Sequence, residues 1–166
     1  MMIAVLADTH VPKRAKTLPA RAWDILRQAD AIIHAGDVLN EQFLDELRML
    51  AIPLHAVRGN NDITLRHLPE TLELGLEGVR VAVIHDSGAK KGRAERMTKR
   101  FPNADLIIFG HSHIPVNERH GAVLLFNPGS PTDRRRQPSC TMGLLHISAG
   151  HVQVEIIPVT DAASTG

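Results

Sequence analysis

The stretch that decides the fold is MIAVLADTH, residues 2–10, in which six apolar residues are followed at once by Asp8, Thr9 and His10. A short apolar run without polar alternation is typical of a strand that is buried on both faces. Such a strand delivers its first polar side chains at its carboxyl end. The sequence therefore predicts a buried strand over residues 2–7 with Asp8 and His10 at its tip.

Four further apolar runs end in the same way, in a short loop that carries Asp, Asn or His. They span residues 31–34, 53–57, 79–84 and 106–109, and the loops after them contain Gly36-Asp37, Gly59-Asn60, His85 and Gly110-His111-Ser112-His113. Apolar residues at helical spacing lie between the first three runs, over residues 18–29 and after Asn40, which can cap its helix. This alternation of strands and helices predicts βαβ units and a parallel sheet.

The second half of the sequence predicts more strands than helices. A basic helix is expected over residues 92–100, and strands are expected over 71–76, 123–126, 141–147 and 152–159. Part of the sheet system should therefore be antiparallel. No internal repeat or linker interrupts the chain, so we expect one domain over residues 1–166, with a frayed tail at 161–166.

The polar strand ends should meet in one place, because the carboxyl ends of parallel strands lie along the same edge of a sheet, where ligands bind. The crevice would contain Asp8, His10, Asp37, Asn60, His85, His111 and His113. Burying so many polar groups together is costly without a counter-charge, which divalent cations supply. Seven ligands are too many for one ion but suit two ions about 3.5–4 Å apart that share a carboxylate.

Each of these motifs is weak evidence for a metal site when it is taken alone. An aspartate at a strand end is frequently a helix cap, and a lone histidine is usually a core or surface residue. Five such motifs in order, each after an apolar strand, are hard to explain without a shared site. Glycines at positions 36, 59 and 110 would let the backbone turn sharply beside the ions.

This ordered set of motifs resembles the calcineurin-like metallophosphoesterase superfamily, and specifically its small bacterial and archaeal phosphodiesterase branch. The resemblance extends from Asp8-Thr9-His10 to Asn127-Pro128-Gly129-Ser130, which is most of the chain. It implies an α/β fold, a four-layer αββα sandwich of two mixed β-sheets flanked by helices, with the metals at the strand ends.

The resemblance also implies a role for each ligand. One ion would be held by Asp8, His10, Asp37 and His113, and the other by Asp37, Asn60, His85 and His111, with Asp37 bridging. A water or hydroxide between the ions would attack phosphorus in line with the leaving oxygen, and Asp37, Asn60 and His111 are the expected catalytic residues. Manganese is the first choice of metal, and iron, zinc, nickel and cobalt are the alternatives, since mixed nitrogen and oxygen ligands accept all of them.

Two positions depart from the family pattern. Asn61 stands where relatives that hydrolyse phosphoproteins carry a histidine that serves as general acid, and an amide cannot replace it. We therefore expect phosphodiesters with acidic leaving groups to be cut better than monoesters. Asp86 stands where the branch has glycine after the ligand histidine. Aspartate tolerates a left-handed backbone, and we expect Asp86 to cap the turn at Ser87-Gly88.

Two further sets of residues have open interpretations. Arg134, Arg135 and Arg136 follow the Asn127–Ser130 loop and form either a substrate contact or a solvated loop. His34 ends a strand beside the site, and it either contacts Asp37 or packs in the core.

Composition limits the cellular compartment and the classes of partner that we expect. The formal net charge of +1 and the length of 166 residues argue against binding of extended nucleic acid, so a small phosphodiester is the expected substrate. The single cysteine, Cys140, indicates a reducing cytoplasm. No apolar run approaches the roughly 20 residues that span a bilayer, so no membrane association is expected. Association into a homo-oligomer is left open.

Two alternatives to a phosphodiesterase remain. The family includes members that became protein-binding scaffolds of the same fold, but all seven expected ligands are present here. The same dimetal chemistry would also suit a small nuclease or a cyclic-nucleotide phosphodiesterase.

Overall fold

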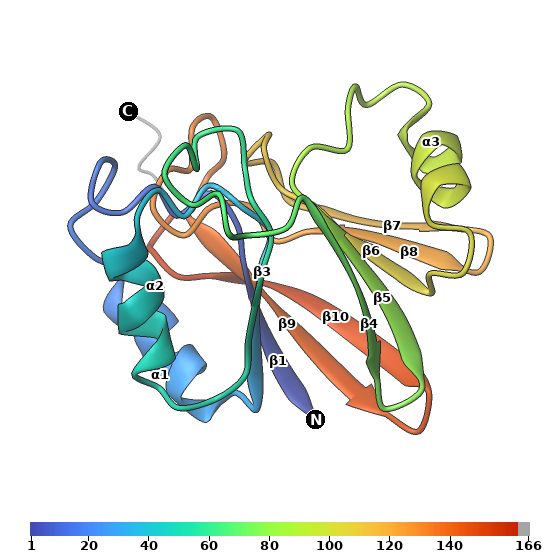
Figure 1. The fold of residues 1–166 in the computed structure, drawn as a ribbon, viewed down its shortest axis with the longest axis horizontal. Coiled ribbons are helices and arrows are strands. Elements are labelled where there is room, and N and C mark those ends of the chain that lie inside the picture. The colour runs from blue at the N-terminus through green and yellow to red at the C-terminus, as the bar shows by residue number, and fades with distance from the viewer. Residues whose placement is uncertain (163–166) are drawn as a thin grey trace.

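The computed structural model describes residues 1–162, and the part of the predicted frayed tail from residue 163 onward lies outside the described residues. Two five-stranded sheets pack face to face, with two helices outside one sheet and a third helix outside the other (Figure 1). These four layers are the αββα sandwich that the family resemblance implied. No helix among the described residues is long and apolar enough to span a bilayer.

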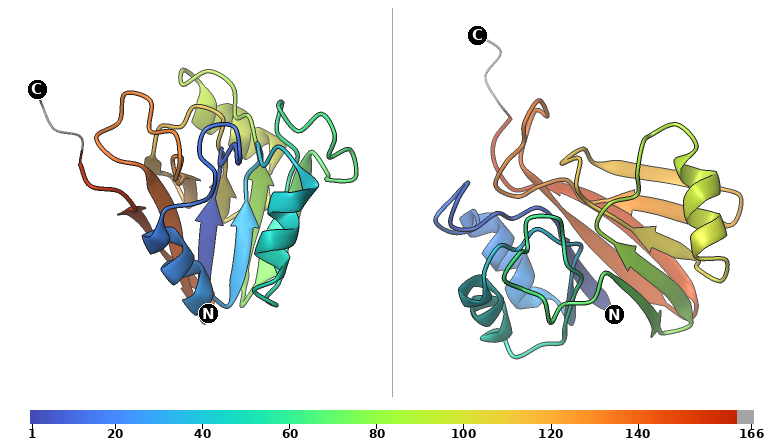
Figure 2. Two further views of the ribbon diagram at one scale, coloured as in Figure 1. Left: turned by 90° about the vertical axis from the view of Figure 1, so that its left-hand side faces the viewer. Right: turned by 45° about the horizontal axis from the view of Figure 1, so that its top comes forward.

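The first sheet, here called sheet A, has the strand order β10-β9-β1-β2-β3. Its strands are β1 (Met2–Leu6), β2 (Ala31–His34), β3 (Leu54–Ala56), β9 (Thr141–Ser148) and β10 (His151–Pro158). Strands β1, β2 and β3 are parallel to one another, with Leu6 beside His34 and His34 beside Ala56. Strand β9 pairs antiparallel with β1, and β10 pairs antiparallel with β9. The three parallel strands therefore end level with one another, at the edge where the loops gather in Figure 2.

The second sheet, sheet B, has the strand order β4-β5-β6-β8-β7. Its strands are β4 (Thr71–Leu76), β5 (Val79–Ile84), β6 (Leu106–Ile108), β7 (Val116–His120) and β8 (Val123–Asn127). The central strands β5, β6 and β8 are parallel, and β4 and β7 are antiparallel edges. Both sheets are thus mixed, as expected.

Strand β7 was not predicted from the sequence. It lies at the edge of sheet B, and four of its five residues are exposed. An edge strand that faces water needs no apolar pattern, so Asn117 to His120 carry no signal of burial.

Three helices cover the outer faces of the two sheets. Helices α1 (Ala20–Gln28) and α2 (Glu41–Arg48) lie on sheet A, and α3 (Arg93–Arg100) lies on sheet B. The predicted cap of α2 is present, because the Asn40 side chain accepts a hydrogen bond of 3.0 Å from the Phe43 amide.

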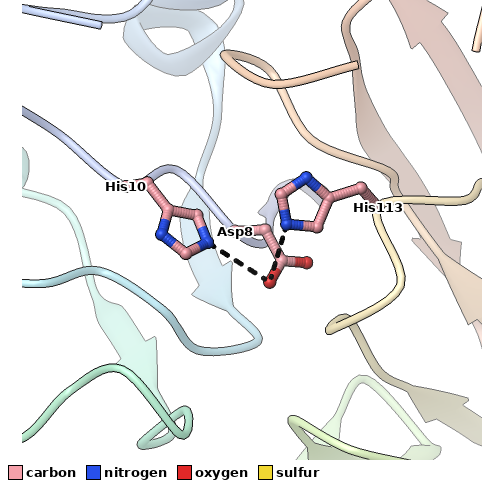
Figure 3. A group of neighbouring side chains, drawn as sticks. All are labelled: Asp8, His10 and His113. Atoms are coloured by element: carbon pink, nitrogen blue, oxygen red, sulfur yellow. Dashed lines mark ion pairs between the residues drawn. The ribbon is translucent and has the colours of Figure 1, made fainter. Parts of the chain in front are cut away.

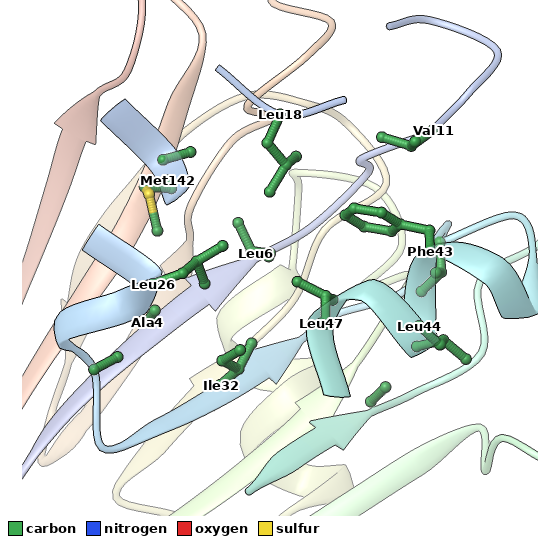
Figure 4. Packing of buried hydrophobic residues seen from close by; sticks show 14 of the residues in the cluster. Ala4, Leu6, Val11, Leu18, Leu26, Ile32, Phe43, Leu44, Leu47 and Met142 are labelled. Carbon is green, nitrogen blue, oxygen red and sulfur yellow. The ribbon is translucent and has the colours of Figure 1, made fainter. Parts of the chain in front are cut away.

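The core is divided by the sheets, which explains the unbroken apolar runs of β1 and β2. Leu6 and Ile32 face helices α1 and α2 and pack with Phe43 and Leu47 (Figure 4). Their neighbours along the strands, such as Val5 and Ile33, face sheet B. Successive side chains of a strand point to opposite faces, so a strand covered on both sides must be apolar at every position.

Candidate metal centre

The five polar loops predicted from the sequence lie together at one edge of the sandwich. Nε2 of His10 lies 3.3 Å and Nε2 of His85 lies 3.4 Å from the same carboxylate oxygen of Asp37, although the three loops follow β1, β5 and β2. Nε2 of His113, after β6, lies 3.7 Å from Oδ1 of Asp8. Residues more than 100 positions apart, such as Asp8 and His113, therefore face one point.

Two groups of three side chains have the spacing that a metal ion requires. Asp8, His10 and His113 form one group, and Asp8, Asp37 and His85 form the other, with the ligand atoms of each group within 4.8 Å of one another. Figure 3 shows the Asp8 carboxylate between the two imidazoles of the first group. Asp8 belongs to both groups, and Asp37 contacts His10 as well as His85, so both carboxylates lie between the two positions.

The remaining two predicted residues extend the second group toward solvent. Oδ1 of Asn60 lies 3.0 Å from Nε2 of His85 and 3.2 Å from Nδ1 of His111. The His111 side chain is 45 % exposed, whereas that of His113 is 1 % exposed. We call Asp8, His10 and His113 the buried half of the site, and Asn60 and His111 the open half. Asp37 and His85 lie between the halves.

The buried half contains polar atoms without a hydrogen-bond partner. Among residues 1–162, four buried side-chain atoms have none, and three of them are Oδ1 of Asp8, Nε2 of His10 and Nε2 of His113. Leaving such an atom unsatisfied costs about 1–3 kcal/mol. Lone pairs of one carboxylate and two imidazoles aimed at one point are what a divalent cation accepts, so these residues fit a metal ion.

Strained backbone is concentrated in the same loops. Asp8, His10, Asp37, His111 and His113 all have positive φ values, between 45° and 72°. For a residue other than glycine this conformation costs roughly 1–2 kcal/mol. Such strain persists only where the surrounding contacts determine the backbone, and it is typical of ligand-binding sites.

Hydrogen bonds set which ring nitrogen of each histidine faces the site. Nδ1 of His85 contacts the Ala35 carbonyl oxygen at 2.7 Å, and Nδ1 of His113 contacts the Asp133 carbonyl oxygen at 2.8 Å. A carbonyl oxygen can only accept, so in both rings Nδ1 carries the proton and donates. Nε2 of His113 then faces the site without a partner, and Nε2 of His85 faces Oδ1 of Asn60; in the neutral ring either nitrogen could bind a metal through its lone pair.

The carboxylates of the site have opposite pKa shifts. Burial raises the pKa of Asp8 to about 7, which is the expected effect of removing a carboxylate from water. Burial also acts to raise the pKa of Asp37, but the nearby imidazoles of His10, at 3.3 Å, and His85, at 3.4 Å, outweigh it and lower that pKa. For His85 the burial effect is likewise outweighed, by the hydrogen bond to Asp37 and the charge of Asp8, and its pKa rises to about 9. A cation beside Asp8 would supply the missing counter-charge.

Asp62 is a buried residue of the site to which the sequence assigned no role. Its carboxylate accepts hydrogen bonds from three backbone amides, those of Asp37 at 2.9 Å, Gly59 at 2.7 Å and Leu39 at 2.8 Å. It therefore fixes the loop of Asp37 against the loop of Asn60. Its position at the end of the Gly59-Asn60-Asn61-Asp62 motif was the only sequence signal.

The loop after β8 supports the first metal-bearing loop. The Ser130 hydroxyl donates to the Asp8 carbonyl oxygen at 2.8 Å, and the Thr132 hydroxyl donates to the Thr9 carbonyl oxygen at 2.6 Å. Asn127 donates from Nδ2 to the Gly110 carbonyl oxygen at 3.1 Å. The Asn127-Pro128-Gly129-Ser130 motif thus holds the backbone on which Asp8 and His111 lie.

At two of the predicted positions, glycine is needed because a neighbouring side chain lies very close to the backbone, more than because the backbone turns there. A methyl group at Gly36 would lie 2.6 Å from Nδ1 of His85, and one at Gly59 would collide with the Asp37 carboxylate. Gly36 also has a φ of 98°, but Gly59 does not have a positive φ. At Gly59 it is the space beside the Asp37 carboxylate, and not a left-handed backbone, that requires glycine.

The two departures from the family pattern have definite contacts. Asn61 donates to the Asp37 carboxylate from its backbone amide at 2.9 Å and from Nδ2 at 2.8 Å.

Asp86 accepts a hydrogen bond of 2.8 Å from the Gly88 amide, which confirms the predicted turn cap. The left-handed backbone expected at Asp86 is wrong, since its φ is not positive. Its other oxygen lies 3.9 Å from Nε2 of His111.

His34 packs in the core and supports Thr9. Its Nδ1 accepts from the Gly36 amide at 3.1 Å, so Nε2 carries the proton and donates to the Thr9 hydroxyl at 3.0 Å. Complete burial lowers the pKa of His34 to about 3 and keeps the ring neutral. The alternative of a direct side-chain contact with Asp37 is not what the structure has.

The three consecutive arginines differ in direction. Arg134 donates to the Gln137 carbonyl oxygen within its own loop at 2.7 Å. Nη1 of Arg135 lies 3.5 Å from the carbonyl oxygen of Ser112, which belongs to the His111–His113 loop. All three side chains are exposed, and Arg135 is the one of the triplet that reaches the metal-bearing edge.

Comparisons with known proteins agree with this geometry. Residues 1–150 match the family described as calcineurin-like phosphoesterase superfamily domain. A probable metallophosphoesterase of Methanothermobacter thermautotrophicus is 35 % identical over 165 residues, which cover 95 % of this chain and 92 % of the relative.

Two solved structures share the fold at lower identity. An archaeal phosphodiesterase has a TM-score of 0.73 at 22 % identity, with 95 % of this chain and all of that chain covered. A zinc complex of Vps29 from Entamoeba histolytica has a TM-score of 0.76 at 24 % identity, covering 96 % of this chain and all of that chain. With two mixed sheets, clustered metal-binding side chains and a family match over most of its length, the chain belongs to the calcineurin-like phosphoesterase superfamily.

Proposed function

We propose that this protein is a phosphoric ester hydrolase that depends on two divalent metal ions and prefers phosphodiesters to monoesters. The observation that carries the proposal is the cluster of unpaired buried atoms on Asp8, His10 and His113, beside a second group formed by Asp8, Asp37 and His85. Family membership supports the reaction class, and the archaeal relative of the same fold is a phosphodiesterase by name.

The proposed ligands divide between the two halves of the site. Asp8, His10, Asp37 and His113 would hold one ion, and Asp37, Asn60, His85 and His111 would hold the other. Two bound ions would lower the pKa of a water molecule and neutralise charge on the phosphoryl oxygens. The contact of Asp37 with both His10 and His85 supports its role as the shared ligand.

The open half provides the approach for substrate. Asn60 and His111 are exposed at the point where a phosphoryl group would arrive, and they orient it as the proposed catalytic residues together with Asp37. Asn61 hydrogen-bonds to Asp37, and its amide is too weak an acid to protonate a leaving oxygen. Substrates whose leaving group needs no protonation are therefore favoured, which is the reason for the proposed diester preference.

Of the three predicted arginines, we propose Arg135 as the contact to the substrate, because it lies beside the His111–His113 loop. Arg134 is held within its own loop. Manganese is the proposed metal, and the zinc bound by the Vps29 relative shows that this fold accepts zinc as well. We further propose one domain over residues 1–166 and a cytoplasmic location, as expected from the single cysteine.

The test is a metal screen on matched substrates. Purified protein is stripped with a chelator and assayed with manganese, nickel, cobalt, zinc or iron on bis(p-nitrophenyl) phosphate and on p-nitrophenyl phosphate. We expect no activity without metal, restoration by at least one ion, and faster hydrolysis of the diester. Clear preference for the monoester would contradict the account of Asn61, and Asn61→His should shift the ratio toward the monoester.

A metal-binding scaffold of the same fold is the second candidate, because Vps29 structures match the chain over nearly its full length. It predicts metal binding without hydrolysis. Elemental analysis that finds bound metal in a protein inactive on every ester would favour this alternative. A cyclic nucleotide or a nucleic-acid end would fall within the proposed diesterase chemistry.

A further inference from the structure

A cavity of about 480 Å³ opens beside the open half of the metal centre. Asn60 and His85 of the metal centre line it, together with the rest of the loop after β3, the start of β4, the end of β5 with Asp86, and the end of α3. Pockets of about 300–1,000 Å³ are typical of small-molecule sites. The cavity is therefore large enough for a part of the substrate that extends beyond the reacting phosphate.

Three arginines line this cavity, namely Arg58, Arg66 and Arg100, and we call it the arginine pocket. They come from segments on both sheets, since Arg58 follows β3 and Arg100 ends α3. Arg58 is paired with Glu70 at 3.0 Å. Within residues 1–162, neither Arg66 nor Arg100 forms an ion pair, so two of the three arginines that line the pocket have no partner carboxylate; the Arg100 guanidinium lies 5.7 Å from the centroid of the Phe101 ring.

The acidic residues of the pocket are engaged elsewhere. The carboxylate of Asp62 is buried and accepts three backbone hydrogen bonds, and Asp86 accepts one from Gly88. The formal charges of the lining balance, with three arginines against Asp62, Glu70 and Asp86, but Arg66 and Arg100 are paired with none of these carboxylates and can bind an anion. The pocket also has an apolar surface, because Ile63 is 74 % exposed at its rim and Ile84 lies in its wall.

A phosphate attached to an organic group matches these features. The planar fork of arginine pairs with phosphate oxygens through two parallel hydrogen bonds, and such charge-assisted bonds are the strong ones. An exposed isoleucine offers a surface for a sugar or a base. A free inorganic anion would use the arginines but not Ile63.

We propose that the arginine pocket binds a second phosphate of the substrate, so that the preferred substrates are nucleotide phosphodiesters that carry an additional phosphate beside the one that is cut. The proposal rests on the proposed function and adds the substrate class. Arg66 and Arg100 bind the second phosphate, and Ile63 contacts the nucleoside between the two phosphates.

The test uses two chromogenic substrates that differ by one phosphate. These are the p-nitrophenyl ester of thymidine 5′-phosphate and the same ester with an added 3′-phosphate. In the wild type we expect the 3′-phosphate to lower KM at least tenfold, which corresponds to about 1.4 kcal/mol, with kcat little changed. In the double variant Arg66→Gln, Arg100→Gln the two substrates should have equal KM values. Arg21→Gln, which changes an exposed arginine on α1, is the control and should keep the difference.

A binding measurement separates this proposal from the proposed function. Thymidine 3′,5′-bisphosphate and thymidine 5′-phosphate are titrated calorimetrically into protein kept metal-free by a chelator. Tighter binding of the bisphosphate to the wild type, lost in the double variant, supports the pocket even if no ester is hydrolysed. Equal binding of the two nucleotides, or equal KM values in an active wild type, overturns the pocket and leaves the hydrolase proposal standing.

Discussion

Nε2 of His113 is buried without a partner, whereas the His111 side chain two residues earlier is 45 % exposed and contacts Asn60. The two histidines come from one loop, and both have positive φ values. One completes the buried half of the metal centre and the other the open half. Under the proposed function this difference would divide the work between the two halves: the buried half would hold metal firmly, and the open half would leave room for substrate.

The largest expected effect comes from Asp37, which contacts both His10 and His85 between the halves. Asp37→Ala removes the proposed shared ligand, so turnover should fall more than a hundredfold, beyond the 10–100-fold typical of residues that only orient ligands. The core does not include Asp37, and the variant should fold. Steady-state kinetics at saturating manganese measures the loss, and wild-type turnover would contradict the proposed bridge.

Comparing His113→Ala with His111→Ala tests the division directly. Manganese at about 100 times its Kd should stabilise the wild type by about 2.7 kcal/mol. We expect His113→Ala to lose most of this stabilisation and His111→Ala to keep more than half, because only His113 contributes an unpaired buried nitrogen. Thermal unfolding with and without manganese measures both. Equal losses in the two variants would show that burial does not separate the halves.

Asp62→Asn should loosen the connection between Asp37 and the open half. An amide cannot accept as many hydrogen bonds as the carboxylate, so at least one of three backbone amides loses its acceptor. The free energy of unfolding should fall by about 1–3 kcal/mol. Asp24→Asn, at an exposed ion pair on α1, is the control and should change it by less than about 1 kcal/mol. Denaturant unfolding of the metal-free proteins measures the difference, and equal stabilities would contradict the role of Asp62.

The smallest effect is expected at Asp86, which lies beside the open half. Asp86→Ala removes the hydrogen bond to the Gly88 amide and should cost about 1 kcal/mol, as a lost helix cap does. Asp86→Asn keeps an acceptor and should retain stability and manganese affinity. A large loss of affinity in Asp86→Asn, measured by calorimetry, would instead assign the carboxylate to the metals through its approach to His111.

Local sequence patterns were sufficient for the buried strands and their helices, and the four layers followed from the family resemblance. The apolar runs at residues 2–7 and 31–34 predicted strands covered on both faces, and β1 and β2 are such strands. The cap at Asn40 was readable because capping involves only residues three positions apart. Since parallel strands bring their carboxyl ends to one edge, the meeting of Asp8 and Asp37 at the end of sheet A also followed from the sequence. His113 joins them from β6 because sheet B packs against sheet A.

Only the tertiary structure decided how these residues are supported and which of them face solvent. The three hydrogen bonds of Asp62, the direction of Arg135 and the exposure of His111 depend on contacts between distant segments, which leave no periodic pattern in the sequence. The same is true of Arg66 and Arg100, which lie 34 positions apart in the sequence and line one cavity because sheet A and sheet B pack face to face. Side-chain direction is determined by packing between layers, and packing is a property of the folded chain.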